Sequence, residues 1–211
     1  MKFSDEQIST LALRIKERLS EKRFVHTLGV LHAAEKIGEY FPDIDVSELS
    51  CAALLHDVSK EESFEEQLAL LNEADFLLSE SDKKSPLILH ALSAPFVVLR
   101  EFSEYATANV LSAVQNHTTG APDMSVFDEI VMISDYVEAG RSYDGCVSVR
   151  NELFDDLKKS KNELECESAL HKAVYKCLVN TEKDVLKRGR FLNERSIVTK
   201  DHFATLTNNK C

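Results

Sequence analysis

The segment CAALLHDVSK, residues 51–60, places a His56–Asp57 pair directly after an apolar run. With the preceding DVSELS it predicts a helix over residues 45–60 whose middle is buried on most sides. Adjacent residues on a helix point about 100° apart, so the pair can serve one site only where two helix faces meet a pocket. Taken alone, the pair is most simply a histidine at the edge of a helix beside a hydrated aspartate. The rest of the chain must therefore decide between a structural pair and a site.

The remaining sequence predicts further helices and few turns. Six glycines and four prolines among 211 residues are too few for the many tight turns of an all-β fold. Ser4 is expected to cap the first helix with Gln7 as its capping-box partner, and Pro95 is expected to break the fifth helix. Besides residues 45–60, the predicted helices are residues 4–20, 22–41, 63–78, 85–102, 104–117, 125–140, 146–162 and 165–189. We therefore expect one all-α domain over residues 1–190 and a polar C-terminal extension, residues 191–211, that ends in a partly frayed tail.

Composition and charge limit the partners of the protein. Hydrophobic residues make up 44% of the chain, as in globular proteins, while the net charge of −11 repels nucleic acid polymers and anionic membranes. An anionic substrate would therefore need a strong local positive site, such as a metal. The five cysteines form no C-x-x-C pair, and neither a signal peptide nor a membrane-spanning apolar run is present, so we expect a cytoplasmic location. The sequence leaves the oligomeric state open, a homodimer included.

Histidine and aspartate residues recur in apolar surroundings on separate predicted helices. A buried histidine needs partners for its ring nitrogens, and a buried carboxylate is costly unless it is paired or bound to a metal. Converging His and Asp ligands are how helical bundles hold metals, and a set without thiolate favours iron or manganese over zinc and nickel. Histidines satisfied by ordinary hydrogen bonds in the core are the other interpretation. The residues in question are His26, His56, Asp57, His90, His117 and Asp135.

These four histidines and two aspartates suffice for two divalent ions, with Asp57 placed to bridge them. Two ions bring four positive charges against two carboxylates, so their pocket would be positive on an otherwise acidic protein. That is the condition required above for a phosphate-containing substrate. Lys60 would lie over the same patch, because it follows His56 by four positions and Asp57 by three. A solvated lysine favoured by the helix dipole is the alternative for Lys60.

Three motifs resemble those of the HD-domain metal-dependent phosphohydrolases: RFVHTLGV at residues 23–30, ALLHDVSK at 53–60 and the DY pair at 135–136. Within that superfamily, HTTGAPDMSVFDEIVMISDYVEAGR, residues 117–141, resembles the YqeK family of bacterial HD proteins. Members of this family hydrolyse diadenosine tetraphosphate symmetrically. The resemblance runs over most of the chain and implies an HD-domain helical bundle.

The resemblance also implies roles for the matching residues. It implies two divalent metal ions, iron first, with manganese or zinc as alternatives. Asp57 and Lys60 are the implied catalytic residues, Lys60 as a phosphate contact. The implied metal ligands are His26, His56, Asp57, His90, His117 and Asp135. The residues expected to contact a nucleotide substrate are Arg23, Lys60, Thr118, Thr119, Gly120 and Arg141.

The implied reaction is attack of a hydroxide held between two ions on a central phosphorus, which converts diadenosine tetraphosphate into two ADP. Two alternatives stay open. An HD phosphohydrolase of another nucleotide, such as a mononucleotide phosphatase, would give different products. A non-catalytic nucleotide-binding module would hold one metal ion or none. Its signature would be Ala91 and Leu92, which follow His90 where the family usually has Gly-Pro.

Overall fold

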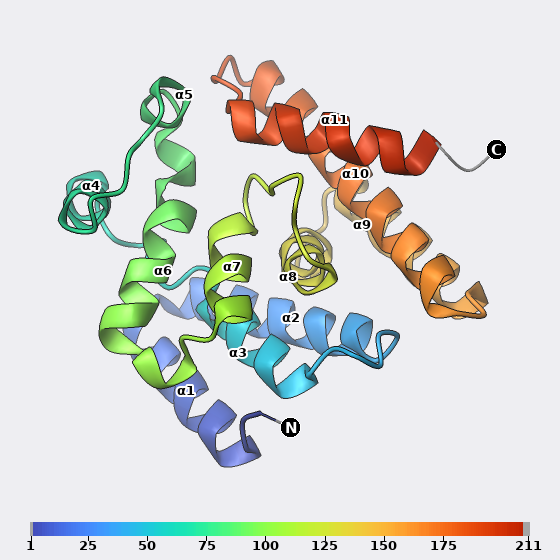
Figure 1. Ribbon diagram of the computed structural model, residues 1–211, viewed down its shortest axis with the longest axis horizontal. Helices are drawn as coiled ribbons and strands as arrows, with labels where there is room; N and C mark the ends of the chain where they lie inside the picture. Colours follow the sequence, from blue (N-terminus) through green and yellow to red (C-terminus); the bar gives the residue numbers. More distant parts are fainter. Residues whose placement is uncertain (1, 209–211) are drawn as a thin grey trace.

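The computed structural model describes residues 2–208, and every regular element within them is a helix (Figure 1). The prediction of an all-α fold is confirmed. Two short 3-10 helices, η1 (Pro86–Ile88) and η2 (Ser103–Tyr105), flank α6. The α-helices are α1 (Asp5–Arg18), α2 (Glu21–Gly38), α3 (Val46–Leu55), α4 (Phe64–Glu73), α5 (Glu80–Lys83), α6 (Leu89–Glu101), α7 (Ala108–Asn116), α8 (Val126–Val137), α9 (Asp144–Lys159), α10 (Glu163–Lys187) and α11 (Glu194–Asn208).

Side-chain caps fix where several helices begin. The predicted capping box at Ser4 is present: its hydroxyl accepts from the Gln7 amide, and the Gln7 side chain accepts from the Ser4 amide. Ser125 and Asp128 form the same arrangement at the start of α8. Each cap satisfies amides that the first turn of a helix leaves without partners. The start of α8, the helix that carries Asp135, is therefore determined locally.

Two predicted details are wrong, and the helix predicted over residues 63–78 also ends early, at Glu73. Pro95 does not break the fifth helix, because α6 continues through it with the proline buried. A proline inside a helix costs about 3 kcal/mol, and the packing of α6 against α4 and α7 outweighs that cost. The helix that leads to the His-Asp pair also ends early, at Leu55, with His56 as its C-cap. Asp57 therefore lies in the turn beyond α3 rather than on a helix face.

Helix α8 occupies the centre of the bundle and is seen end-on in Figure 1. It packs against α2, α7 and α10, and more lightly against α3 and α9. Its residues Ile130, Val131 and Ile133 are fully buried in a core shared with these helices. Each helix around α8 turns one face toward the interior of the bundle. Polar side chains on these inward faces therefore lie close to one another beside α8.

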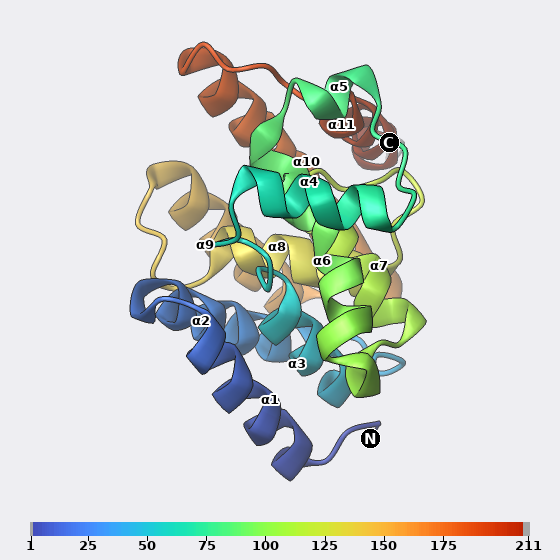
Figure 2. The same ribbon diagram turned by 90° about the vertical axis from the view of Figure 1, so that its left-hand side faces the viewer.

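Helix α11 packs along α10 at the C-terminal end (Figures 1 and 2). Its Phe203 is buried. The expected extension, residues 191–211, thus contains a packed helix, while residues 209–211, where the tail was expected to fray, lie outside the described residues. The division into a domain and an extension stays a prediction. Across residues 2–208, no helix combines the length and the apolar character that a membrane span requires.

Candidate metal centre

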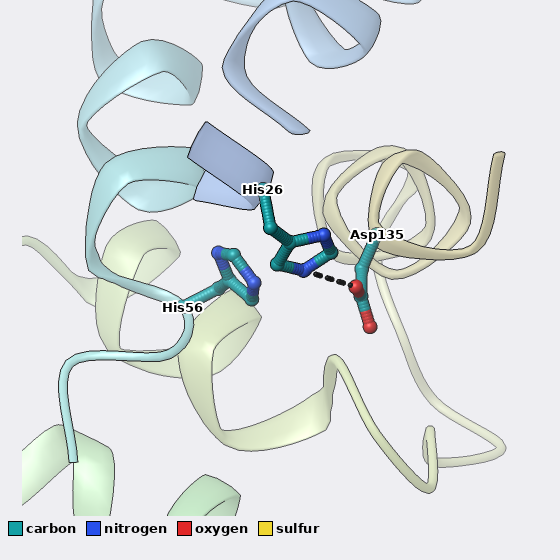
Figure 3. Close-up of side chains that lie close together, drawn as sticks. All are labelled: His26, His56 and Asp135. Carbon is teal, nitrogen blue, oxygen red and sulfur yellow. Dashed lines mark ion pairs between the residues drawn. The ribbon is translucent and has the colours of Figure 1, made fainter. Parts of the chain in front are cut away.

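The six predicted ligand side chains converge in two groups, each of two histidines and one aspartate. Within each group the potential ligand atoms all lie within 4.8 Å of one another. Figure 3 shows the first group, whose side chains reach the same space from α2, the end of α3 and α8. We call His26, His56 and Asp135 triad A, and Asp57, His90 and His117 triad B.

Asp57 lies between the two triads. Its Oδ2 atom is 3.4 Å from His56 Nε2 and 3.9 Å from His26 Nε2, which belong to triad A. Its Oδ1 atom is 3.4 Å from His90 Nε2 and 3.6 Å from His117 Nε2, which belong to triad B. One oxygen of the same carboxylate thus faces each triad, as in a ligand that bridges two ions.

Backbone carbonyls orient two of the histidines. His56 and His117 are the C-cap residues of α3 and α7. Each ring places Nδ1 2.7 Å from the carbonyl oxygen three residues earlier, that of Ala53 and of Val114 respectively. A ring that donates from Nδ1 keeps the lone pair on Nε2, and such a backbone partner is usual behind a metal-bound histidine. Both residues therefore present Nε2 to the site.

A buried carboxylate orients His26. Glu138 Oε1 lies 3.2 Å from His26 Nδ1, and Glu138 Oε2 accepts from the Gly140 amide. Two glycines make room for this carboxylate, because a Cβ atom on Gly29 or Gly140 would lie 2.5 Å or 2.9 Å from Glu138 Oε2. Glu138 was not among the residues predicted for the site; the sequence marks it only by its place three residues after Asp135 in the family-like string.

His90 is the point where three polar groups meet. Its Nε2 atom is 3.2 Å from His117 Nε2, 3.0 Å from Lys60 Nζ and 3.1 Å from Thr118 Oγ1. Burial and the charge of Lys60 hold the pKa of His90 well below its ordinary value, so the ring is neutral at pH 7. Neutral imidazole is the form that binds a metal. Burial also lowers the pKa of Lys60.

The triads contain ring nitrogens whose hydrogen-bonding capacity the protein does not satisfy. Nε2 of His26 and of His56 are buried and have no hydrogen-bond partner among the described residues, although His26 Nε2 lies 2.9 Å from Asp135 Oδ1 (Figure 3). Burial opposes ionisation of both carboxyls, but electrostatic attraction by the His56 imidazole holds the pKa of Asp57 well below its ordinary value, and the Arg141 guanidinium does the same for Asp135. Ionised carboxylates beside unpaired imidazole nitrogens are donors that divalent transition metals prefer. The residues present fit two such ions.

Two arginines contact the aspartates. Arg23 Nη1 donates to Asp57 Oδ2 at 2.8 Å, and Arg141 Nη2 donates to Asp135 Oδ1. Arg150 fixes the segment that carries Arg141, because its guanidinium donates to three backbone carbonyl oxygens at the end of α8 and just beyond it. The guanidinium groups of Arg23 and Arg141 therefore lie at the edge of the candidate centre, where they could contact an anionic group.

A cavity of about 1040 Å³ opens beside the triads. His117 and Asp135 form part of its wall, together with Lys60 and Arg141. Seven lysine and arginine side chains line the cavity against two carboxylates, those of Asp135 and Asp184. The cavity is therefore positive on a protein whose net charge is −11.

The expected substrate contacts separate into two sets. Gly120 is not brought to the cavity wall: its amide donates to the Asn116 carbonyl at 2.8 Å, and the residue is buried beside Thr199 of α11. Its φ of 65°, which suits glycine, instead allows the turn after α7. Arg23 reaches the site through Asp57. The expected contacts that do line the cavity are Lys60, Thr118, Thr119 and Arg141.

The other histidines lie outside both triads. The His32 side chain is 78% exposed on α2 and faces away from the centre, as its spacing from His26 predicts. His171 is half-buried on α10, where its Nε2 atom lies 3.3 Å from Glu129 Oε1 of α8. That contact forms a separate, metal-independent pair of polar groups in the core.

Comparison with known proteins agrees with this geometry. The family model described as HD domain matches residues 23–140, which contain all six converging side chains. A solved structure described as a predicted HD superfamily hydrolase involved in NAD metabolism, from Clostridium acetobutylicum, superimposes with a TM-score of 0.79. It is 26% identical, and the match covers 96% of this chain and 98% of that one.

Three curated proteins named symmetrical bis(5'-nucleosyl)-tetraphosphatase are similar in sequence. The protein from Halalkalibacterium halodurans is 29% identical over 187 residues, 88% of this chain and 90% of the relative. The Bacillus subtilis protein is 29% identical over 69% of this chain and 77% of its own length. The Staphylococcus aureus protein is 30% identical over 66% of this chain and 71% of its own length. The similarity thus extends well beyond the metal centre.

Proposed function

The chain belongs to the HD domain family, and on that premise we propose that it hydrolyses diadenosine tetraphosphate symmetrically into two ADP. The observation that carries the proposal is the position of Asp57, with one oxygen toward each triad, beside a positive cavity. The names of the three curated relatives support the choice of substrate.

The six side chains of the triads would hold two divalent ions, with Asp57 shared between them. Such ions supply positive charge that stabilises the transferring phosphoryl group, and they lower the pKa of water at the site. The donor set contains imidazole and carboxylate but no thiolate, which supports iron, with manganese or zinc as alternatives. Glu138 and the carbonyls behind His56 and His117 fix the orientation of the rings that would bind the ions.

Lys60 and Arg141 would hold the phosphate chain over the triads. Both line the cavity and lie against a triad: Lys60 Nζ is 3.0 Å from His90 Nε2, and Arg141 contacts Asp135. Their positive charges offset the charge that develops on the phosphoryl oxygens during transfer. The Thr118 hydroxyl, 3.1 Å from His90 Nε2, would donate to one of those oxygens.

The bond changes are those of a hydrolysis. A water oxygen bonds to one of the two central phosphorus atoms, and the bond from that phosphorus to the central bridging oxygen breaks. The water proton passes to solvent, and each half leaves as ADP. Because ADP is a good leaving group, no side chain has to protonate it. Transfer is direct to water, so no covalent bond to the protein forms.

The cysteines support a reducing, cytoplasmic setting. The four cysteines in the described part of the chain are free and buried. Burial raises the pKa of the Cys51 thiol to about 12, so this thiol is unreactive at neutral pH. These residues act as small apolar side chains of the core.

Product analysis tests the proposed function. The metal-loaded protein is incubated with diadenosine tetraphosphate in ¹⁸O-labelled water, and the nucleotides are separated and their masses measured by mass spectrometry. We expect two ADP per substrate, with one ¹⁸O atom on the terminal phosphate of one of them. AMP with ATP, or the absence of turnover with iron, manganese and zinc alike, would contradict the proposal.

A further inference from the structure

The cavity continues beyond the triads to a rim built from two distant segments. One segment is residues 84–88, which follow α5, and the other is residues 183–193, the end of α10 and the connection to α11. Figure 2 shows α5 beside α11 at one end of the molecule, and Figure 1 shows the same neighbourhood from another side. The side chains on which the inference rests, called the outer rim, are Lys84, Lys183, Lys187, Arg190 and Phe191.

The outer rim carries charge that the protein leaves without counter-charge. Among residues 2–208, no ion pair joins its three lysines and Arg190 to a carboxylate, whereas the neighbouring Arg188 pairs with Asp184 at 2.9 Å. All four cations are exposed. Like charges held side by side repel one another, and a bound anion relieves that repulsion. On a chain with a net charge of −11, such a cluster concentrates attraction for anions at the cavity mouth.

A buried network joins the two segments of the rim. Asp82 is fully buried and accepts hydrogen bonds from Asn193 Nδ2 and from Arg195 Nε and Nη2, each at 3.1 Å. The Glu194 amide donates to Ser81 Oγ at 2.8 Å. We call this network the Asp82 clasp. It holds the segment after α5 against the start of α11, so the rim is a built part of the cavity rather than a set of loose surface side chains.

An aromatic ring lies among the rim cations. Phe191 is 47% exposed in the cavity wall, and Lys84 Nζ lies 5.7 Å from the centre of its ring. An exposed ring face is a platform on which a nucleobase stacks, and cations beside it suit the attached phosphate. The rim thus offers the two kinds of contact that one nucleotide needs.

The size of the cavity leaves room for that nucleotide. Its volume of about 1040 Å³ lies at the upper end of the range of about 300–1000 Å³ in which drug-sized ligands bind. Lys60 and Arg141 contact the triads, so the outer rim is a separate set of contacts in the same cavity. Resting on the proposed function, we propose that the outer rim binds the second nucleotide of a dinucleoside polyphosphate, with its base on Phe191 and its phosphates on the rim cations.

Charge reversal at the rim tests this assignment. The double variant Lys187→Glu/Arg190→Glu is compared with Lys158→Glu/Lys159→Glu, which reverses two exposed charges at the end of α9, outside the cavity. We expect KM for diadenosine tetraphosphate to rise about tenfold in the rim variant, with kcat and the inhibition constant of ADP unchanged. Phe191→Ala should raise KM similarly, because stacking of one base is lost. The assignment is overturned if the rim variant has the same KM as the α9 control, or if its inhibition constant for ADP rises by the same factor as its KM for diadenosine tetraphosphate.

Binding measurements separate this inference from the proposed function. Calorimetric titration of the metal-loaded protein uses ADP and a diadenosine tetraphosphate analogue whose central bridging oxygen is replaced by methylene. The wild type should bind the analogue about tenfold more tightly than ADP, and both rim variants should lose that advantage. Equal affinities in the wild type overturn the rim assignment even if two ADP are formed. Conversely, if the wild type binds the analogue through the rim but forms no ADP from diadenosine tetraphosphate, only the proposed function is contradicted.

Discussion

Two buried carboxylates, Asp57 at the metal centre and Asp82 in the clasp, show opposite ways of placing a charge inside a protein. Asp82 is fully buried, and the protein satisfies it with donors from Asn193, Arg195 and the Ser79 amide. Asp57 is equally enclosed, yet most of the groups that face it are imidazole nitrogens. A satisfied network stabilises the fold, whereas the buried Nε2 atoms of His26 and His56 beside Asp57, which have no hydrogen-bond partner among the described residues, cost stability and mark a place for a ligand.

That contrast predicts that activity and stability separate. Substitutions at the centre should abolish turnover or metal binding with little effect on folding, and substitutions at the clasp should do the reverse. The following measurements at the centre, at the clasp and at one further buried carboxylate test and extend this contrast, in order of decreasing expected effect.

Asp57→Ala should reduce turnover of diadenosine tetraphosphate by at least about 1000-fold, because both triads lose a shared ligand. Bound metal should fall from two ions per chain to fewer than one, as measured by elemental analysis. Asp155→Ala, at an exposed position of α9, is the control and should retain both ions. A variant with normal turnover would contradict the assignment of the centre.

Lys60→Ala should lower kcat by about 100-fold, because a charge that meets the phosphoryl oxygens is removed. Since Lys60 contacts His90 but is not in either triad, elemental analysis should still find two ions. Lys36→Ala, on the exposed face of α2, supplies the control. Loss of metal together with activity would show instead that Lys60 supports the ligands.

The two triads should release their ions at different rates. All three side chains of triad B are buried, whereas His26 and Asp135 of triad A are partly exposed. With a chelator, one ion per chain should be lost about tenfold faster than the other. A time course of elemental analysis on desalted samples measures this, and a single phase for both ions would remove the distinction between the triads.

Asp82→Asn should lower the free energy of unfolding by about 2 kcal/mol and the Tm by about 4–8 °C, with kcat changed less than twofold. Burial opposes ionisation, but hydrogen bonds from Arg195 and Asn193 lower the pKa of Asp82 to about 2. The clasp therefore stabilises fully above the ordinary pKa of 3.8 and loses this contribution as pH falls toward 2.

The stability difference between wild type and Asp82→Asn should accordingly narrow between pH 4 and pH 2, as followed by circular dichroism. Glu80→Gln, an exposed position of the same short helix, is the matched control. A difference that stays constant with pH would mean that the carboxylate charge does not stabilise the clasp.

Glu129→Gln should have the smallest effect, a rise in Tm of about 1–2 °C at pH 8. Burial raises the pKa of Glu129, although His171 partly opposes the shift. The folded state therefore binds a proton more tightly than the unfolded state, and stability is lost as pH rises through the pKa of the folded form. The rise in Tm should vanish at pH 4, and Glu17→Gln on α1 should show none at either pH.

The sequence alone predicted those features that depend on local chemistry. The helix start at Ser4 follows from a capping box within four residues, and a helix was likewise predicted to begin at residue 125, where Ser125 caps α8. The convergence of the triads could be expected because unusual polar residues occupied apolar stretches of several helices. The continuity of α6 through Pro95 could not be predicted, since the packing that offsets the cost of this proline comes from other helices.

Other features of the site depend on contacts between residues far apart in the chain. Glu138 meets His26 across 112 positions, and Asp82 meets Arg195 across 113. Each of these residues is an ordinary charged side chain in its own segment. Only the three-dimensional arrangement distinguishes them from solvated surface residues.

The two glycines beside Glu138 make the centre sensitive to changes that touch no ligand. One methyl group on Gly29 or Gly140 would collide with the carboxylate that steers His26. Alanine at either position would thus weaken metal affinity in a folded protein whose coordinating side chains are all intact. Glycine at both positions is therefore part of what the centre requires, beside the ligands themselves.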